Sequence, residues 1–105
     1  MLRIYEVALG VIAKLRPEIE RIERRDPDLA RQLRRASTSV VLNIAEGSSS
    51  QGKNRRARYF NALGSAKEVR AGQQVALAFG YIESVDAELA DHLERVIATL
   101  INLTV

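Results

Sequence analysis

The chain has 105 residues, no cysteine and a net charge of +3. This length suits one domain with its own core, and the absence of cysteine excludes disulfides, thiolate metal sites and a cysteine nucleophile. The longest stretch without a charge, residues 71–82, is too short to span a membrane, and no signal-peptide cleavage site follows the apolar start. We therefore expect a cytoplasmic protein without a membrane partner.

The first two helices are predicted over residues 2–24 and 27–47. Apolar residues of the first recur every three or four positions, the spacing of one helix face. Pro17 interrupts this pattern and should kink the helix or split it near Leu15. Asp26 followed by Pro27 combines an N-cap residue with the proline that the first position of a helix tolerates, so the second helix should begin there.

Two further helices are predicted over residues 53–80 and 85–103. The sequence Gly-Ser-Ser-Ser-Gln-Gly over residues 47–52 is typical of a loop before the third helix. Gly80 should end the third helix, and Ser84 should cap the start of the fourth. No segment sustains the alternation of a strand. The expected fold class is all-α, an antiparallel up-down four-helix bundle in which residues 1–105 form one domain.

A polar stripe runs along the second predicted helix beside its apolar face. Its members are spaced by four, four and three residues, so they share an arc of about 80°: Arg35, Ser39, Asn43 and Glu46. A polar edge beside a core costs stability unless each group finds a partner. We therefore interpret the stripe, together with two residues of the third helix, as a structural polar network of Arg35, Ser39, Asn43, Glu46, Ser65 and Glu68.

The partners within this network follow from folding the second and third helices into a hairpin. Arg35 should then lie opposite Glu68 and form a partly buried ion pair with it. Ser39 should face Leu63 or Gly64, and Glu46 should face Arg55 or Arg56.

A second apolar face is predicted near the end of the second helix. Val41, Leu42 and Ala45 point away from the stripe formed by Val40 and Ile44. One bundle core does not cover both faces, so either another protomer or a long neighbouring helix should cover the second. We favour a homo-oligomer.

Basic residues concentrate in the middle of the chain. Residues 21–58 carry a net charge of +6, and residues 81–105 carry −4. Cations at the start of the third helix oppose its dipole, so either an anion such as a phosphate or acids within the assembly should offset them. We expect any nucleic-acid surface to include Arg31, Arg34, Lys53, Arg55, Arg56 and Arg58. The five aromatic residues lie at core spacing, we expect three of them in the core, and they predict no stacking platform.

Catalytic and metal-binding motifs are weak in this chain. Gly47 to Asn54 resembles a phosphate-binding loop, but Asn54 replaces the required hydroxyl and helical periodicity precedes the loop instead of a strand. His92 is the only histidine, which excludes a histidine-rich di-iron site and leaves it as a surface or interface residue. We expect no enzyme activity, no metal and no cofactor.

Three segments carry a family resemblance. Arg34-Arg35-Ala36 leads through Ser39 to Asn43-Ile44-Ala45-Glu46-Gly47, and Gly64-Ser65-Ala66-x-Glu68 and Gly80-Tyr81-Ile82 follow. The chain thereby resembles the four-helix-bundle proteins of the 23S rRNA intervening-sequence family. It departs from the usual pattern over residues 17–28. The resemblance implies a non-enzymatic bacterial protein that forms homopentamers. It also implies a fold similar to the accessory variability protein of diversity-generating retroelements, with a nucleic-acid or reverse-transcriptase partner there.

Two functional hypotheses remain open. The first is a homo-oligomeric scaffold, expected to be a pentamer, that binds structured RNA or DNA through its arginine-rich surface. The alternative is a protein-interaction module whose basic face docks an acidic partner and whose polar stripe is purely structural. They differ in the salt-dependent nucleic-acid binding that only the first requires.

Overall fold

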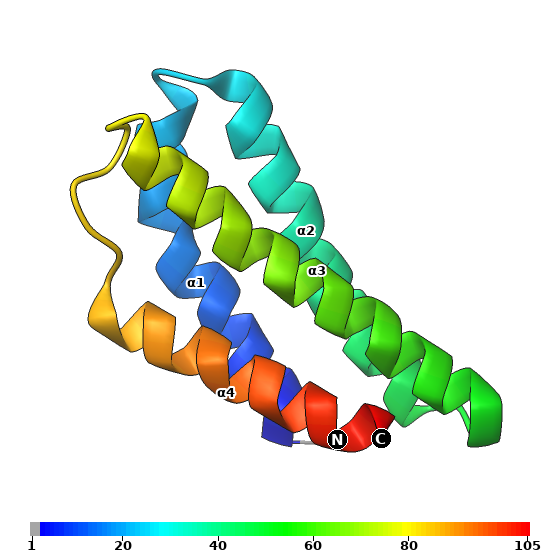
Figure 1. Ribbon diagram of the computed structural model, residues 1–105. Helices are drawn as coiled ribbons and strands as arrows, with labels where there is room; N and C mark the ends of the chain where they lie inside the picture. The colour runs from blue at the N-terminus through cyan, green and yellow to red at the C-terminus, as the bar shows by residue number, and fades with distance from the viewer. Residues whose placement is uncertain (1–2) are drawn as a thin grey trace.

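The computed structural model describes residues 3–105 and contains four α-helices within them (Figure 1). They are α1 (Arg3–Glu23), α2 (Pro27–Ser48), α3 (Gly52–Ala78) and α4 (Ala87–Thr104). Successive helices run antiparallel, and each packs mainly against two others, with α1 contacting α2 and α4, and α3 contacting the same two. The described chain forms an elongated bundle of 42 × 24 × 20 Å, which confirms the predicted four-helix fold.

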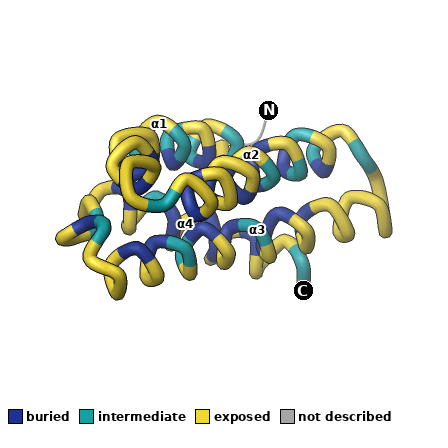
Figure 2. The backbone as a smooth tube through the Cα atoms, turned by 90° about the horizontal axis from the view of Figure 1, so that it is seen from above, coloured by how far each residue is buried: buried dark blue, intermediate teal, exposed yellow. Residues whose placement is uncertain are grey.

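One hydrophobic core runs along the inside of all four helices. Apolar residues spaced by three and four positions face inward, and the opposite faces are exposed (Figure 2). Burial of these side chains supplies the main driving force for folding. The largest fully buried apolar side chains are Leu15, Ile22, Leu33, Ile44, Leu89 and Leu100. Within residues 3–105 no helix is apolar enough over a sufficient length to cross a membrane.

The start of α2 matches its prediction, and the start of α4 does not. Asp26 caps α2, because its carboxylate accepts a 3.0 Å hydrogen bond from the amide of Leu29. The prediction of Ser84 as the cap of α4 is wrong. Asp86 takes that role and accepts a 2.9 Å hydrogen bond from the amide of Leu89. The chain before Asp86 remains non-helical while it crosses from α3 and buries Ile82 in the core.

Pro17 lies inside α1 without dividing it. Of the two predicted effects, a kink or a split near Leu15, the split does not occur, since the helix continues from Arg3 to Glu23. Proline removes the hydrogen bond to the carbonyl four residues earlier, that of Ala13. Both Pro17 and Ala13 are exposed, so water can donate a hydrogen bond to the Ala13 carbonyl. The helix therefore tolerates the proline on its solvent-exposed face.

A buried polar pair joins α1 to α3 across the core. Glu18 is 2% exposed and Gln73 is 3% exposed. The Gln73 side-chain amide donates a 2.9 Å hydrogen bond to Glu18 Oε1, and the backbone amide of Asp86 donates one of 3.3 Å to Glu18 Oε2. Both carboxyl oxygens of Glu18 thus have partners, and the pair ties the C-terminal parts of α1 and α3 to the start of α4.

The α2–α3 pair is held together closely at its loop end. Gly47 packs against the buried Tyr59 ring, where a Cβ atom on residue 47 would lie 2.5 Å from Tyr59 Cε1. At Val41 the second apolar face of α2 is covered by neighbouring helices of the same chain, which is one of the two alternatives that the sequence left open. Val41 is buried because α1 and α3 pack on two sides of α2, whereas its neighbour Leu42 is 57% exposed.

Candidate nucleic-acid interface and polar groove

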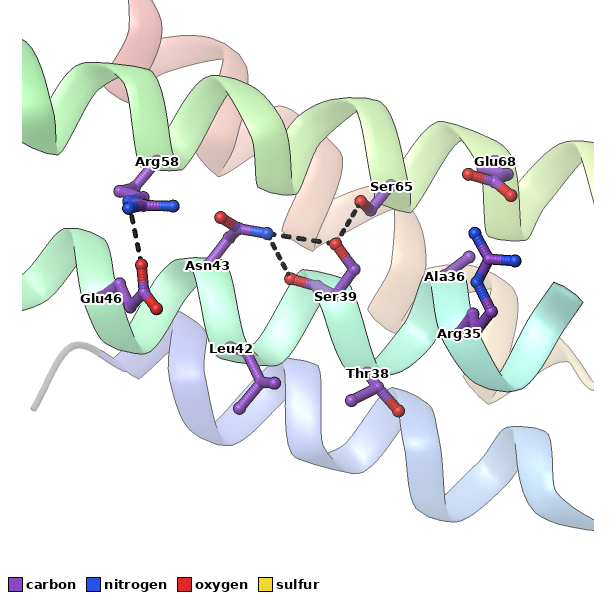
Figure 3. Close-up of a pocket in the computed structure, with 10 residues that line it drawn as sticks. All are labelled: Arg35, Ala36, Thr38, Ser39, Leu42, Asn43, Glu46, Arg58, Ser65 and Glu68. Carbon is purple, nitrogen blue, oxygen red and sulfur yellow. Dashed lines mark hydrogen bonds and ion pairs between the residues drawn. The ribbon is translucent and has the colours of Figure 1, made fainter. Parts of the chain in front are cut away.

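A polar groove separates the exposed edges of α2 and α3 (Figure 3). It encloses about 610 Å³ and is open to solvent. Side chains of α2 line one side of the groove, and side chains of α3 line the other. The polar residues that line it are Arg35, Thr38, Ser39, Asn43, Glu46, Arg58, Ser65 and Glu68. The groove therefore gathers all six residues of the predicted polar network.

Hydrogen bonds connect the centre of the groove. The hydroxyl oxygens of Ser39 and Ser65 lie 2.8 Å apart and join α2 to α3. The Asn43 side-chain amide donates to the Ser39 carbonyl at 2.9 Å and to the Ser39 hydroxyl at 3.1 Å. This half-buried chain of polar groups stabilises one register between the two helices.

The register of the hairpin differs slightly from the prediction. Ser39 meets Ser65 instead of Leu63 or Gly64, and Glu46 forms a 2.9 Å ion pair with Arg58 instead of Arg55 or Arg56. The predicted pairing compared Cα positions, but helical side chains lean toward the N-terminus of their own helix. Because α2 and α3 are antiparallel, the tilt of the side chains on both helices moves the contact partner of each α2 residue to a higher residue number in α3.

Arg35 and Glu68 face each other at the far end of the groove (Figure 3). The prediction of a partly buried ion pair is wrong for the isolated chain. Both residues are exposed, and within residues 3–105 no ion pair joins them. The cause is their place at the groove's open edge, where solvation competes with a contact between two charges.

The acidic groups of the groove lie apart from each other. Glu46 and Glu68 occupy opposite ends of the drawn region (Figure 3). Among the described residues no three histidine, aspartate or glutamate side chains gather closely enough to hold a metal ion. The one histidine has its Nδ1 atom 2.7 Å from the carbonyl of Glu88, one turn away on α4. The groove's chemistry is hydrogen bonding and charge pairing.

The cations at the start of α3 lie beside the C-termini of two other helices. Arg55 Nε donates to the carbonyl of Gly47 at 3.2 Å, in the last turn of α2, and to that of Ser50 at 2.8 Å, in the loop after α2. Arg56 Nε donates at 3.1 Å to the carbonyl of Thr104, at the end of α4. Positive charge opposes the dipole of α3 itself but complements the negative ends of α2 and α4. This antiparallel arrangement explains why the sequence tolerates the cluster.

The four basic residues of this end nevertheless differ in how they are engaged. Arg58 pairs with Glu46, and within residues 3–105 Arg55 and Arg56 form hydrogen bonds only through their Nε atoms. Lys53 is exposed and forms no hydrogen bond or ion pair with the described residues. We call the group of Lys53, Arg55, Arg56 and Arg58 the basic end of α3; no acid lies in the first turn of that helix.

Arg31 and Arg34 lie elsewhere and are paired with acids. Arg31 forms an ion pair with Asp28, and Arg34 makes two hydrogen bonds of 2.9 and 3.3 Å with the Glu23 carboxylate. About 20 Å of α2 separates Arg34 from the loop that leads into α3. Within one chain the six predicted basic residues therefore form two separate groups, because Arg31 and Arg34 lie toward the start of α2 and the other four lie at the start of α3.

We expect the pairing of Arg34 to be measurable as a pKa shift. The hydrogen bond and charge of the Arg34 guanidinium lower the pKa of the Glu23 carboxyl below its ordinary value of 4.5. A lowered pKa in the folded state adds stability above the unfolded pKa, and this stability is lost as the pH falls through the folded value. Side-chain carboxyl NMR should show Glu23 titrating low in the parent and near 4.5 in Arg34→Gln. Equal values in the two proteins would contradict the pairing.

Three of the five aromatic side chains pack in or against the core, the number expected from the sequence, and the other two are exposed. Tyr59 is buried, and Tyr5 and Tyr81 pack partly buried against the core. Phe60 and Phe79 are 64% and 65% exposed, so the prediction that no aromatic surface is available is wrong for these two. Phe60 lies one turn beyond Arg56 on α3, and neither its apolar character nor its helical spacing distinguished it from a core residue.

Comparison with known proteins gives one match. No curated protein and no solved structure matches the chain. The model of the 23S rRNA-intervening sequence protein family matches residues 2–102, nearly the full length of the chain. The match includes the polar groove and the basic end of α3. The chain therefore belongs to the 23S rRNA-intervening sequence protein family.

Proposed function

We propose that this protein is a non-enzymatic, homo-oligomeric helical scaffold that binds structured RNA or DNA through the basic end of α3. The observation that carries the proposal is the set of exposed guanidinium and ammonium groups there. Lys53, Arg55 and Arg56 have no acidic partner among the described residues, whereas Arg31 and Arg34 do. Cations left without acids are the groups available to phosphates.

The helical frame supports this role by holding the cations in place. Arg55 and Arg56 are each anchored through Nε to a carbonyl at the end of another helix. An anchored guanidinium loses less side-chain entropy when it binds a phosphate than a free one does. A cytoplasmic location follows from the proposal, because cellular RNA is found there.

Self-association is supported by apolar side chains exposed in the single chain. Nine large ones are more than one third exposed among the described residues: Leu9, Leu42, Phe60, Val75, Leu77, Phe79, Ile101, Leu103 and Val105. Scattered exposed apolar residues are ordinary, but Leu42 lines the same groove as Arg35 and Glu68, two charges that form no ion pair among the described residues. A neighbouring copy that covers this edge would bury Leu42 and supply partners for both charges.

Oligomeric state can be tested directly by light scattering after size exclusion. We expect the parent to have a mass five times the 11.7 kDa of one chain, and Leu42→Gln to assemble less well at the same concentration. Leu9→Gln, at an exposed apolar residue of α1, is the matched control. A monomeric parent would contradict the scaffold proposal.

Nucleic-acid binding is tested by titrating labelled RNA and DNA, single-stranded and duplex, at two salt concentrations. We expect binding at low salt and an affinity that falls as salt rises, because cations released from phosphates drive association. Absence of binding at low salt, or binding that added salt leaves unchanged, would contradict the proposal. Binding of an acidic protein in place of nucleic acid would instead favour an interaction module.

A further inference from the structure

A shallow hollow on the exposed face of α3 combines an aromatic ring with two cations. It encloses about 310 Å³ and is lined by Lys53, Arg56, Ala57, Phe60 and Asn61. These positions share one side of the helix, since residues 56, 57 and 60 follow residue 53 by three, four and seven positions. Phe60 is 64% exposed, so much of its ring is open to solvent.

The neighbours of the ring leave it accessible. Ala57, one turn before Phe60, has a small side chain that does not cover the ring. Asn61 adds an amide that can donate and accept hydrogen bonds. A Cβ atom on Gly64, one turn after Phe60, would meet nothing within 4 Å, so the surface stays open on that side as well.

The charge of the hollow is entirely positive. None of its five lining residues is acidic. Arg56 donates through Nε to the carbonyl of Thr104, which holds the guanidinium at the rim. Lys53 has no ion pair within residues 3–105.

We infer that this hollow binds an unpaired nucleobase, which stacks on Phe60 while Lys53 and Arg56 contact the flanking phosphates. The inference rests on the proposed function and adds to it the recognition of single-stranded segments. A base has a flat face for an aromatic ring and carries an anionic backbone, which matches the two features of the hollow. A second copy docked two-fold through this same face would bring Lys53 and Arg56 against their own like charges.

If an unpaired base stacks on Phe60, the protein should prefer single-stranded over double-stranded nucleic acid. Bases inside a duplex are stacked on each other and cannot reach Phe60 without being unpaired. Single-stranded RNA should therefore bind more tightly than the duplex formed with its complement. Removing one stacking contact should weaken single-stranded binding by about fivefold or more, with little effect on the duplex.

The test uses two exposed phenylalanines that differ in their surroundings. Phe60→Leu should weaken binding of a labelled single-stranded RNA, whereas Phe79→Leu should leave it unchanged. Phe79 is 65% exposed and lies at the opposite end of α3, stacked on Tyr81. Circular dichroism and light scattering on each variant verify that fold and assembly are retained.

A fluorescence reporter tests the stacking itself. The chain contains no tryptophan, so Phe60→Trp and Phe79→Trp each introduce a single indole. Single-stranded RNA should quench the indole of Phe60→Trp and leave that of Phe79→Trp unchanged. Equal quenching of both, or equal RNA affinity of Phe60→Leu and the parent, would overturn the inference while leaving salt-dependent binding intact. Loss of assembly in Phe60→Leu would also overturn it, because a second copy would then occupy the hollow.

Discussion

Replacing Gln73 by leucine is expected to lower the free energy of unfolding by about 3 kcal/mol. The Gln73 amide donates to Glu18 Oε1 in the core, where both side chains are nearly fully buried. Leucine would leave that oxygen of a buried carboxyl group without a donor, and an unsatisfied buried polar atom costs more than the net gain from the hydrogen bond. Urea unfolding of parent and variant measures the difference.

A double variant separates the lost hydrogen bond from other effects of the substitution. Glu18→Met combined with Gln73→Leu removes both partners and fills the site with apolar groups of similar size. We expect this protein to be more stable than Gln73→Leu alone, because no polar side-chain atom is left without a partner. A double variant that is less stable than the single one would contradict this explanation.

Gly47→Ala is the second substitution with a large expected effect. The added Cβ would lie 2.5 Å from Tyr59 Cε1 and 2.7 Å from Tyr59 Cδ1. Tyr59 is 2% exposed, so its ring has little room to move. Overpacking of this kind costs about 1–3 kcal/mol, which outweighs the helix propensity that alanine adds. We expect thermal unfolding to begin several degrees lower, at about 4–8 °C per kcal/mol for a chain of this size.

Gly64→Ala provides the matched control for this prediction. Gly64 is also in a helix, but a Cβ built there meets nothing within 4 Å. Alanine should therefore stabilise α3 by up to about 1 kcal/mol. Thermal unfolding followed by circular dichroism should move in opposite directions for the two variants. Two shifts of the same sign would show that contact with Tyr59 does not determine the role of Gly47.

Helix periods and caps were predictable because they depend on local sequence. The core positions of α1 and α4 recur every three or four residues, and Asp26-Pro27 is a strong local start signal. Ser84 and Asp86 are both good cap residues, so local preference alone could not choose between them. Burial of Ile82 and the hydrogen bond from Asp86 to Glu18 are tertiary features that settle the choice.

The groove was predictable in its members and less so in its contacts. Spacing on α2 placed Ser39, Asn43 and Glu46 on one face, and the structure joins Ser39 to Ser65 and Glu46 to Arg58. Whether a charged side chain forms an ion pair depends on the direction of the side chain and on its solvent exposure. Arg35 is an example, because it is exposed and has no ion pair among the described residues. Neither quantity can be obtained from residue spacing.

The proposed nucleic-acid surface could likewise be predicted only in part from the sequence. Counting charges identified the basic middle of the chain, but only the arrangement of helices shows that Arg34 is occupied by Glu23 while Lys53 remains unpaired among the described residues. The exposure of Phe60 is likewise set by the packing of α3 against α2 and α4, which spacing cannot distinguish from a core position.

The most direct test of the nucleic-acid proposal is the salt dependence of RNA affinity in Lys53→Gln. Lys53 makes no contact that the fold requires, so its removal reports on binding alone. Arg24→Gln is the control, since Arg24 is an exposed cation that directly follows the end of α1, and the length of α2 separates it from the start of α3. The slope of log affinity against log salt should become shallower by about 0.7–0.9 in Lys53→Gln and remain unchanged in Arg24→Gln. Identical slopes in the parent and both variants would show that the basic end of α3 does not contact phosphate.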